Sequence, residues 1–145
     1  MPTVRRTREL RASPEDVWTV LADPHHLPRW WPRVQRVESV DADQWTAVLA
    51  TERGKPVRAD FRVVESEEPR RRVWEQELAD SPFERLLAEA VTAATLEPGG
   101  DGTRVTLEVR QRLRGLNRLG SFFVKRATRA QVDEALAGLE AACAR

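Results

Sequence analysis

Hydrophobic and polar residues alternate over most of the chain, and helical spacing replaces this alternation near the start and at the end. Residues 4–10 alternate and predict an edge strand. Alternate residues of a strand share a face, so Arg6 and Arg8 belong to the face of Val4 and Leu10. If Leu10 lies in the core, Arg8 points toward the inner side of the sheet.

Two proline-containing segments then predict short helices. Ser13 can cap the first, because Pro14-Glu15-Asp16 places proline at the first helical position and acidic residues in the first turn. The apolar side of this helix consists of Val17, Trp18 and Leu21. Asp23-Pro24 begins a second, bent helix. Its apolar residues recur at helical spacing and are Leu27, Trp30, Trp31 and Val34.

Alternation returns after these helices and predicts a series of strands separated by turn residues. The expected strands are residues 34–40, 44–52, 57–66, 71–78, 84–96 and 103–113. Residues 98–102 read Pro-Gly-Gly-Asp-Gly, which is typical of a hairpin loop. The connections are too short for parallel crossovers, so we expect an antiparallel meander.

The C-terminal segment, residues 116–144, contains no proline and repeats apolar residues at helical spacing. The repeating positions are Val132, Leu136, Leu139 and Cys143. The order of strand, short helices, meander and long helix predicts a single α+β domain over residues 1–145. A curved antiparallel sheet wrapped around the last helix is the economical arrangement, and it leaves space between sheet and helix.

Composition narrows the functional classes. The net charge is only +1, whereas proteins that bind nucleic acids or anionic membranes carry an excess of basic residues. No apolar run is long enough to span a membrane, and the charged N-terminus differs from a signal peptide. The single cysteine, Cys143, cannot form an internal disulfide. We therefore expect a cytoplasmic protein without membrane insertion or a nucleic-acid partner, and its oligomeric state stays open.

Few residues offer metal or nucleophilic chemistry. The two histidines, His25 and His26, are adjacent, and no Cys, Asp or Glu spacing completes a metal site with them. No serine or cysteine has a recognisable base and orienting partner. We expect neither a metal nor another cofactor, and catalytic residues stay unknown.

Several motifs carry a resemblance to a known superfamily. They are residues 10–18 (LRASPEDVW), 21–24 (LADP), 27–32 (LPRWWP) and 96–106 (LEPGGDGTRVT). Over nearly its whole length the chain resembles the SRPBCC superfamily, also called START-like or Bet v 1-like. Among its branches, the pattern looks most like the bacterial polyketide cyclase/dehydrase and lipid-transport group.

The resemblance implies a helix-grip fold around an apolar cavity that holds lipids, polyketides, sterols or other small hydrophobic molecules. The motifs are structural, so they specify the fold and leave the function open. The second helix commonly covers the cavity mouth in this fold, which makes Trp30 and Trp31 candidate ligand contacts. All candidate contacts are Arg8, Trp30, Trp31, Phe61, Trp74, Gln76, Ala88, Ala90, Val109, Gln111 and Phe122.

Polar candidates each allow two interpretations. Arg8 can anchor a ligand carboxylate or enolate, or it can bend to solvent and pair with a protein carboxylate. Gln76 and Gln111 lie among apolar residues, so each either bonds a ligand or is satisfied within the protein. Glu75, Glu77 and the run of arginines at residues 70–72 are expected on the solvent face.

Small residues occupy one expected face of the strand at residues 84–96. This face carries Leu86, Ala88, Ala90, Thr92, Ala94 and Leu96. Small side chains beneath a helix leave room for a cavity, unless Phe122, Phe123 or a tryptophan fills the space. Phe122 is therefore a candidate either to contact the ligand or to replace it.

Three functions follow from these patterns. The first is non-covalent binding of a small hydrophobic molecule, with or without an anionic group, by a carrier, sensor or sequestering protein. The second is a cofactor-free polyketide cyclase or dehydratase in which Arg8 and a pocket amide stabilise an enolate. The third is a protein-interaction module. Titratable groups in the cavity favour the enzyme, an apolar cavity favours the carrier, and a filled cavity beside an exposed apolar patch favours the interaction module.

Overall fold

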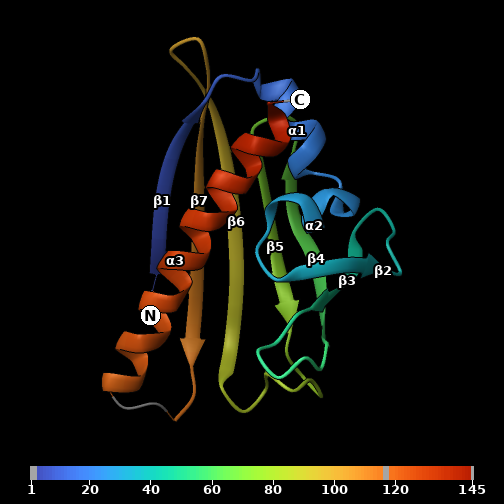
Figure 1. Cartoon of the computed structure of the whole chain (residues 1–145), viewed down its shortest axis with the longest axis vertical. Coiled ribbons are helices and arrows are strands. Elements are labelled where there is room, and N and C mark those ends of the chain that lie inside the picture. Colours follow the sequence, from blue (N-terminus) through green and yellow to red (C-terminus); the bar gives the residue numbers. More distant parts are fainter. Residues whose placement is uncertain (1–2, 116–117, 145) are drawn as a thin grey trace.

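A computed structural model describes residues 3–115 and 118–144 as one curved sheet with a long helix across its concave side (Figure 1). The predicted start of that helix at Leu116 lies outside the described residues. The elements are β1 (Thr3–Leu10), α1 (Pro14–Leu21), η1 (Pro24–His26), α2 (Leu27–Trp30), β2 (Val34–Glu38), β3 (Gln44–Leu49), β4 (Val57–Glu67), β5 (Arg71–Glu77), β6 (Leu87–Gly99), β7 (Gly102–Leu113) and α3 (Arg118–Cys143).

The sheet has seven strands in the order β1-β7-β6-β5-β4-β3-β2. Every paired strand runs antiparallel to its neighbour, and β1 forms one edge beside β7. The predicted α+β class, the antiparallel meander and the edge position of β1 are confirmed. Short turns between consecutive strands from β2 to β7 produce this order, since each turn returns the chain beside the strand it has just left.

Local backbone features make one strand end earlier and another begin later than predicted. The strand predicted at residues 34–40 stops at Glu38, because Ser39 has a φ of 51°. The strand predicted at residues 84–96 begins only at Leu87, because residues 78–86 form a series of turns. These turns matter for the site because they bring Phe83 and Leu86 beside the sheet.

The two helices after β1 begin as predicted. Ser13 Oγ accepts a hydrogen bond from the Asp16 backbone N–H at 3.2 Å, and Pro14 is the first residue of α1. Asp23 caps the second segment by accepting from the backbone N–H of His25 at 3.0 Å. The predicted second bent helix is the short turn η1 followed by α2, which ends where Trp31 becomes extended.

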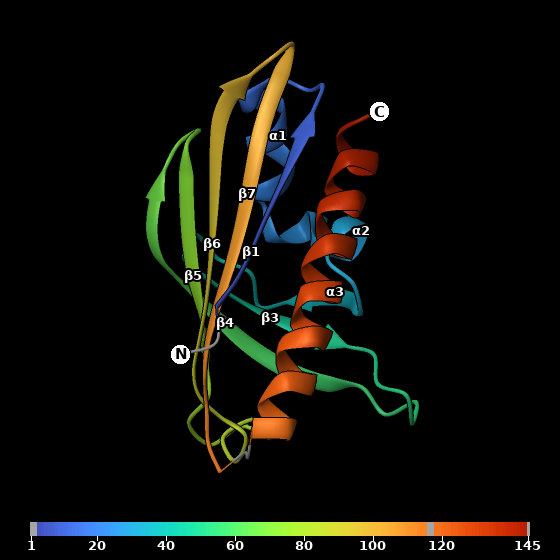
Figure 2. The ribbon, with the colours of Figure 1, turned by 90° about the vertical axis from the view of Figure 1, so that its left-hand side faces the viewer.

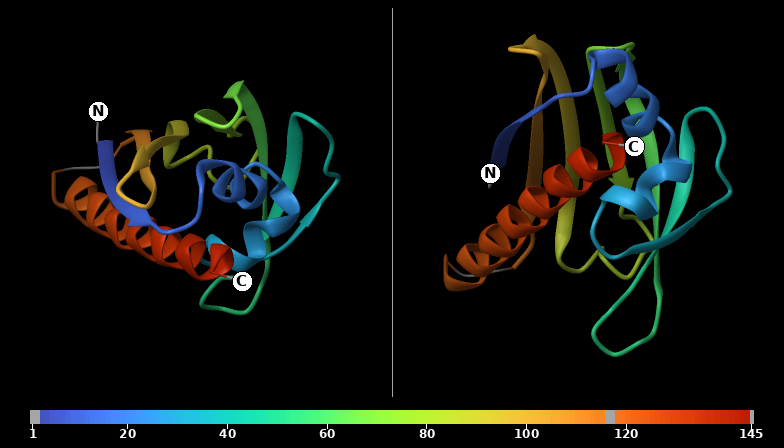
Figure 3. Two further views of the ribbon diagram at one scale, coloured as in Figure 1. Left: turned by 90° about the horizontal axis from the view of Figure 1, so that it is seen from above. Right: turned by 45° about the horizontal axis from the view of Figure 1, so that its top comes forward.

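The long helix α3 packs on the concave side of the sheet, and its C-terminal part lies beside α1 and α2 (Figures 2 and 3). Its buried residues all lie in the second part of the helix and are Thr128, Val132, Ala135, Leu136, Leu139 and Ala142. The predicted stripe therefore faces the core, with Cys143 partly buried at its end.

A glycine allows α3 and α2 to touch. A Cβ atom at Gly138 would lie 2.5 Å from the Trp30 carbonyl oxygen and 3.0 Å from its Cα. No side chain fits in this space, so the closest approach of the two helices depends on Gly138.

Leu136→Ala should destabilise the protein by about 2 to 5 kcal/mol, because Leu136 is buried under the sheet. The urea midpoint measures this loss. Leu119→Ala is the matched control on the exposed side of α3, with an expected change below about 0.5 kcal/mol. Equal losses in the two variants would contradict this orientation of the helix.

Gly138→Ala should lower the free energy of unfolding by about 1 to 3 kcal/mol, although alanine favours helices by about 1 kcal/mol over glycine. The added methyl group would meet the Trp30 carbonyl, so α3 or α2 must shift. Urea unfolding followed by tryptophan fluorescence tests this. A gain in stability would mean that the two helices can separate without cost.

Candidate ligand-binding cavity

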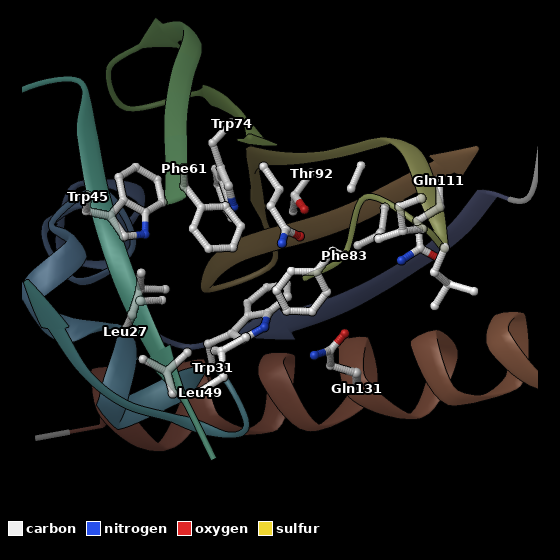
Figure 4. A pocket seen from close by; sticks show the side chains of 17 residues that line it. Leu27, Trp31, Trp45, Leu49, Phe61, Trp74, Phe83, Thr92, Gln111 and Gln131 are labelled. Carbon is white, nitrogen blue, oxygen red and sulfur yellow. The ribbon is translucent and has the colours of Figure 1, made fainter. Parts of the chain in front are cut away.

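A cavity of about 280 Å³ lies between the concave face of the sheet and α3 (Figure 4). Its aromatic lining residues are Trp31, Trp45, Phe61, Trp74 and Phe83. Its aliphatic lining residues are Leu27, Val34, Ala47, Leu49, Leu86, Leu87, Ala90 and Val109. The polar ones are Gln76, Thr92, Gln111 and Gln131. Apart from Leu27, Trp31 and Gln131, the lining comes from strands and from the turns before β6.

Aromatic rings form a continuous wall at one end of the cavity. Trp45 stacks on Phe61, with ring centroids 5.6 Å apart and an angle of 13° between the rings. Trp74 meets both Trp45 and Trp31 edge to face, at 6.3 and 6.4 Å. These rings present a large apolar surface in fixed positions, as a site for a hydrophobic ring compound requires.

The cavity stays open because the side chains of β6 and α3 that face it do not fill it. Ala90 and Thr92 occupy the sheet beneath the helix, and neither side chain is long enough to reach across. The buried residues of α3 begin only at Thr128, and Gln131 faces the cavity from the helix. Small residues on the sheet thus face a part of the helix whose apolar side chains point away from the cavity.

The polar lining groups differ in their hydrogen bonding. Thr128 Oγ1 donates to Gln111 Oε1 at 3.1 Å, so this amide oxygen is satisfied within the protein. Gln76 Nε2 and Trp45 Nε1 are buried, and neither has a hydrogen-bond partner among the described residues. Both unpaired atoms are donors.

The described residues that line the cavity include no lysine, arginine, histidine, aspartate or glutamate. The interior of the cavity therefore offers hydrogen bonds and apolar contact, and it offers no charge.

Most of the expected ligand contacts line this cavity. They are Trp31, Phe61, Trp74, Gln76, Ala90, Val109 and Gln111. The structure brings these residues together from the end of α2 and from four strands, and their contact with a ligand stays a prediction.

Arg8 does not line the cavity, and of its two interpretations the structure shows pairing with a protein carboxylate. Its Nη2 atom donates to Glu140 Oε1 at 2.9 Å on the protein surface, and this hydrogen bond and charge raise the pKa of Arg8. Arg6 likewise pairs with Asp133 at 3.3 Å. Because β1 is the edge strand and lies beside α3, its long side chains reach carboxylates at the exposed side of α3 instead of entering the cavity.

The other expected contacts outside the lining have separate causes. Trp30 is only 3% exposed and packs edge to face on Trp31, at 5.4 Å, so it supports the wall from behind. A register shift between Leu87 and Glu89 breaks the alternation and brings Leu87 into the cavity, whereas Ala88 is outside the lining. Phe122 is 57% exposed on α3 and neither lines nor fills the cavity.

Some lining residues were missed by sequence reasoning. Trp45 and Ala47 alternate on β3, so their shared inward face could have been found from the period. Phe83 and Leu86 come from turns, where no period marks the direction of a side chain.

The run of arginines at residues 70–72 is not wholly solvated, contrary to expectation. Arg70 and Arg71 pair with Glu67 and Glu65 at the surface. Arg72 is 8% exposed, because it shares the inner face of β5 with Trp74, and burial lowers its pKa. Its Nη1 atom donates to Ser66 Oγ at 3.3 Å.

Glu75 on the outer face of β5 and the histidine His25 each pair with a neighbouring side chain. Glu75 pairs with Arg62 across the outer face of the sheet. His25 Nδ1 lies 2.9 Å from Asp23 Oδ1, and within residues 3–115 and 118–144 no cluster of three potential metal ligands occurs. Burial raises the pKa of the Cys143 thiol, which packs against the core.

Helices of the described part of the chain lack the combination of length and apolar character needed to cross a membrane.

Comparison with protein families gives a match over residues 1–144 to the family described as polyketide cyclase / dehydrase and lipid transport. The comparison with curated proteins finds no match.

Solved structures share the fold. A START superfamily protein from Mycobacterium smegmatis has a TM-score of 0.78 and 15% identity, with 97% of this chain and 96% of that chain covered. A protein from Thermus thermophilus has a TM-score of 0.77 and 23% identity, with coverage of 98% and 97%. The di-domain ARO/CYC StfQ of the steffimycin biosynthetic pathway has a TM-score of 0.78 and 15% identity, and this chain, 97% covered, spans 49% of it. These likenesses confirm the helix-grip fold of START-like proteins.

Gln76→Leu should raise the free energy of unfolding of the empty protein by about 1 kcal/mol, because it removes a buried unpaired donor. Gln111→Leu is the matched substitution with the opposite expected sign, a loss of about 1 to 2 kcal/mol, since Thr128 would lose its acceptor. Urea unfolding measures both changes. A clear loss of stability in Gln76→Leu would mean that the Gln76 amide has a partner in the empty protein.

Proposed function

Because the chain belongs to the polyketide cyclase / dehydrase and lipid transport family, we propose that it binds a small hydrophobic molecule reversibly in the cavity under α3. The protein then acts as a carrier, sensor or sequestering protein. The observation that carries this proposal is the aromatic-lined cavity of about 280 Å³. Sites for small molecules are typically apolar cavities with a few fixed polar groups, and this cavity has that character.

Binding is favoured over acid–base catalysis by the chemistry of the lining. General acid–base catalysis needs a titratable group within hydrogen-bond reach of the reacting atom, and the described lining residues include none. The cyclase or dehydratase hypothesis also relied on Arg8 to stabilise an enolate, but Arg8 pairs with Glu140 outside the cavity. The family contains cyclases, so catalysis is the alternative against which binding must be tested.

An interaction module is the third hypothesis. Leu119, Phe122 and Phe123 form an exposed apolar group on α3, with exposed fractions of 63%, 57% and 54%. That hypothesis called for a filled cavity beside the patch, whereas here the cavity is empty of side chains. Ligand binding therefore has the better support. A cytoplasmic location stays part of the proposal, supported by the lone cysteine.

Ala90→Trp should abolish uptake of N-phenyl-1-naphthylamine, an uncharged hydrophobic dye, and change stability by less than about 1 kcal/mol. The new side chain occupies the cavity, so it removes the ligand volume with little overpacking. Dye fluorescence measures uptake and urea unfolding measures stability.

Ala94→Trp is the matched control on the same strand. Ala94 is fully buried and lies outside the cavity lining, so a tryptophan there should cost about 1 to 3 kcal/mol or more by overpacking. Absence of dye binding by the unaltered protein would refute the proposed function. Equal destabilisation by the two substitutions would contradict the open space at Ala90.

A further inference from the structure

The inner face of the sheet carries one row of side chains that crosses the middle of the cavity. Trp45 pairs with Phe61 across β3 and β4, and Phe61 pairs with Gln76 across β4 and β5. Gln76 follows Glu75 and Ala90 precedes Val91 in the antiparallel pair Glu75–Val91, so Gln76 and Ala90 lie side by side. Ala90 in turn pairs with Gln111 on β7. Amides therefore stand on both sides of a single alanine, with the strands about 4.8 Å apart.

Two hydrogen-bond donors in this row have no partner among the described residues. Gln76 Nε2 and Trp45 Nε1 are buried and unpaired within the described residues, and Trp45 is only 4% exposed. Gln111 Oε1 already accepts a hydrogen bond from Thr128 Oγ1. The amide N–H groups of Gln111 are therefore the part of this side chain that a ligand could use. The row thus offers donors, and a molecule above Ala90 would have to supply the acceptor.

Packing gives no reason for an amide at residue 76. The neighbouring side chains of the row are apolar, and an apolar residue of similar size would avoid the cost of an unpaired buried donor. Local departures from well-satisfied packing occur where a site needs them for binding. Gln76 is therefore best explained by a group that is present only when the cavity is occupied.

Charge restricts that group further. The described lining residues offer no cation to a buried carboxylate, so its desolvation would not be compensated. Arg8, the expected anchor for an anion, is engaged by Glu140 at the surface. The expectation that the ligand can carry an anionic group therefore loses its structural basis.

We infer that the cavity selects an uncharged ring compound whose carbonyl oxygen accepts a hydrogen bond from the Gln76 amide. This inference rests on the proposed binding function and narrows its ligand class. The stacked pair of Trp45 and Phe61 supplies a surface for the ring, and Ala90 leaves room for the oxygen between the two amides.

The test uses three probes with one ring system: fluorene, 9-fluorenone and 9-fluorenone-2-carboxylate. They differ in the carbonyl acceptor and in an added carboxylate group, and their binding can be followed by quenching of cavity tryptophans. We expect the carboxylate to bind at least tenfold more weakly than fluorenone, a cost of about 1.4 kcal/mol or more. Gln76→Leu should weaken fluorenone by about three- to tenfold and leave fluorene unchanged or tighter.

Three further variants complete the test. Gln76→Met repeats the loss of the donor with another side-chain shape, in case the leucine variant folds poorly. Trp45→Phe removes the indole N–H, which lies on the far side of Phe61 from Gln76, and keeps a ring, so it should leave the ratio of fluorenone to fluorene affinity unchanged. Gln35→Leu is the matched control at an exposed position outside the lining and should leave the ratio of affinities unchanged.

The outcomes separate this inference from the proposed function. Binding of fluorene and fluorenone with a ratio that no Gln76 variant alters would overturn the inference and keep the binding function. Equal affinity for the carboxylate and the neutral ketone would also overturn it. Failure of all three probes, together with failure of the dye, would overturn the proposed function and this inference with it.

Discussion

The packing of the second part of α3 against α2 and the sheet is the contact on which the remaining structure depends. Val132 and Leu139 are fully buried there, and Gly138 lets the helix backbone touch Trp30. Since close-packed interiors tolerate little displacement, this contact sets the height of the helix above the sheet. The earlier part of α3 carries no such stripe among its described residues, so the space beneath it is left to Ala90 and to the aromatic wall.

The cavity combines rigid apolar walls with a few unsatisfied polar atoms. Trp45, Phe61 and Trp74 hold one another through ring contacts, so the apolar surface exists before any ligand arrives. A preformed site avoids part of the ordering cost of binding. The unpaired donor of Gln76 lowers the stability of the ligand-free protein, and a ligand that accepts its hydrogen bond would recover that free energy.

Charged side chains are kept out of this interior by the position of their strands and by local pairing. Arg8 and Arg6 lie on the edge strand and reach carboxylates of α3, while Glu75 pairs with Arg62 on the outer face. Arg72 is the exception, since it is buried on the inner face near Trp74 but outside the main cavity. The many arginines of the chain therefore do not give the cavity a positive charge.

The sequence by itself determined the elements, their order and the antiparallel sheet, because turn residues, caps and hydrophobic period are local signals. Ser13 caps α1 and the stripe of α3 is buried as these signals indicate. Alternation also identified the inner faces that carry Phe61, Trp74 and Gln111. These are properties that neighbouring residues impose on one another through backbone geometry.

Only the tertiary structure decided which inward-facing residues meet empty space. The pairing of Arg8 outside the cavity depends on Glu140, far away in the sequence, and the exclusion of Ala88 depends on a register shift between strands. Phe83 enters the lining from a turn, and Trp30 is covered by its neighbour Trp31. Each of these outcomes depends on how segments pack in three dimensions, and a periodic pattern contains no information about such contacts.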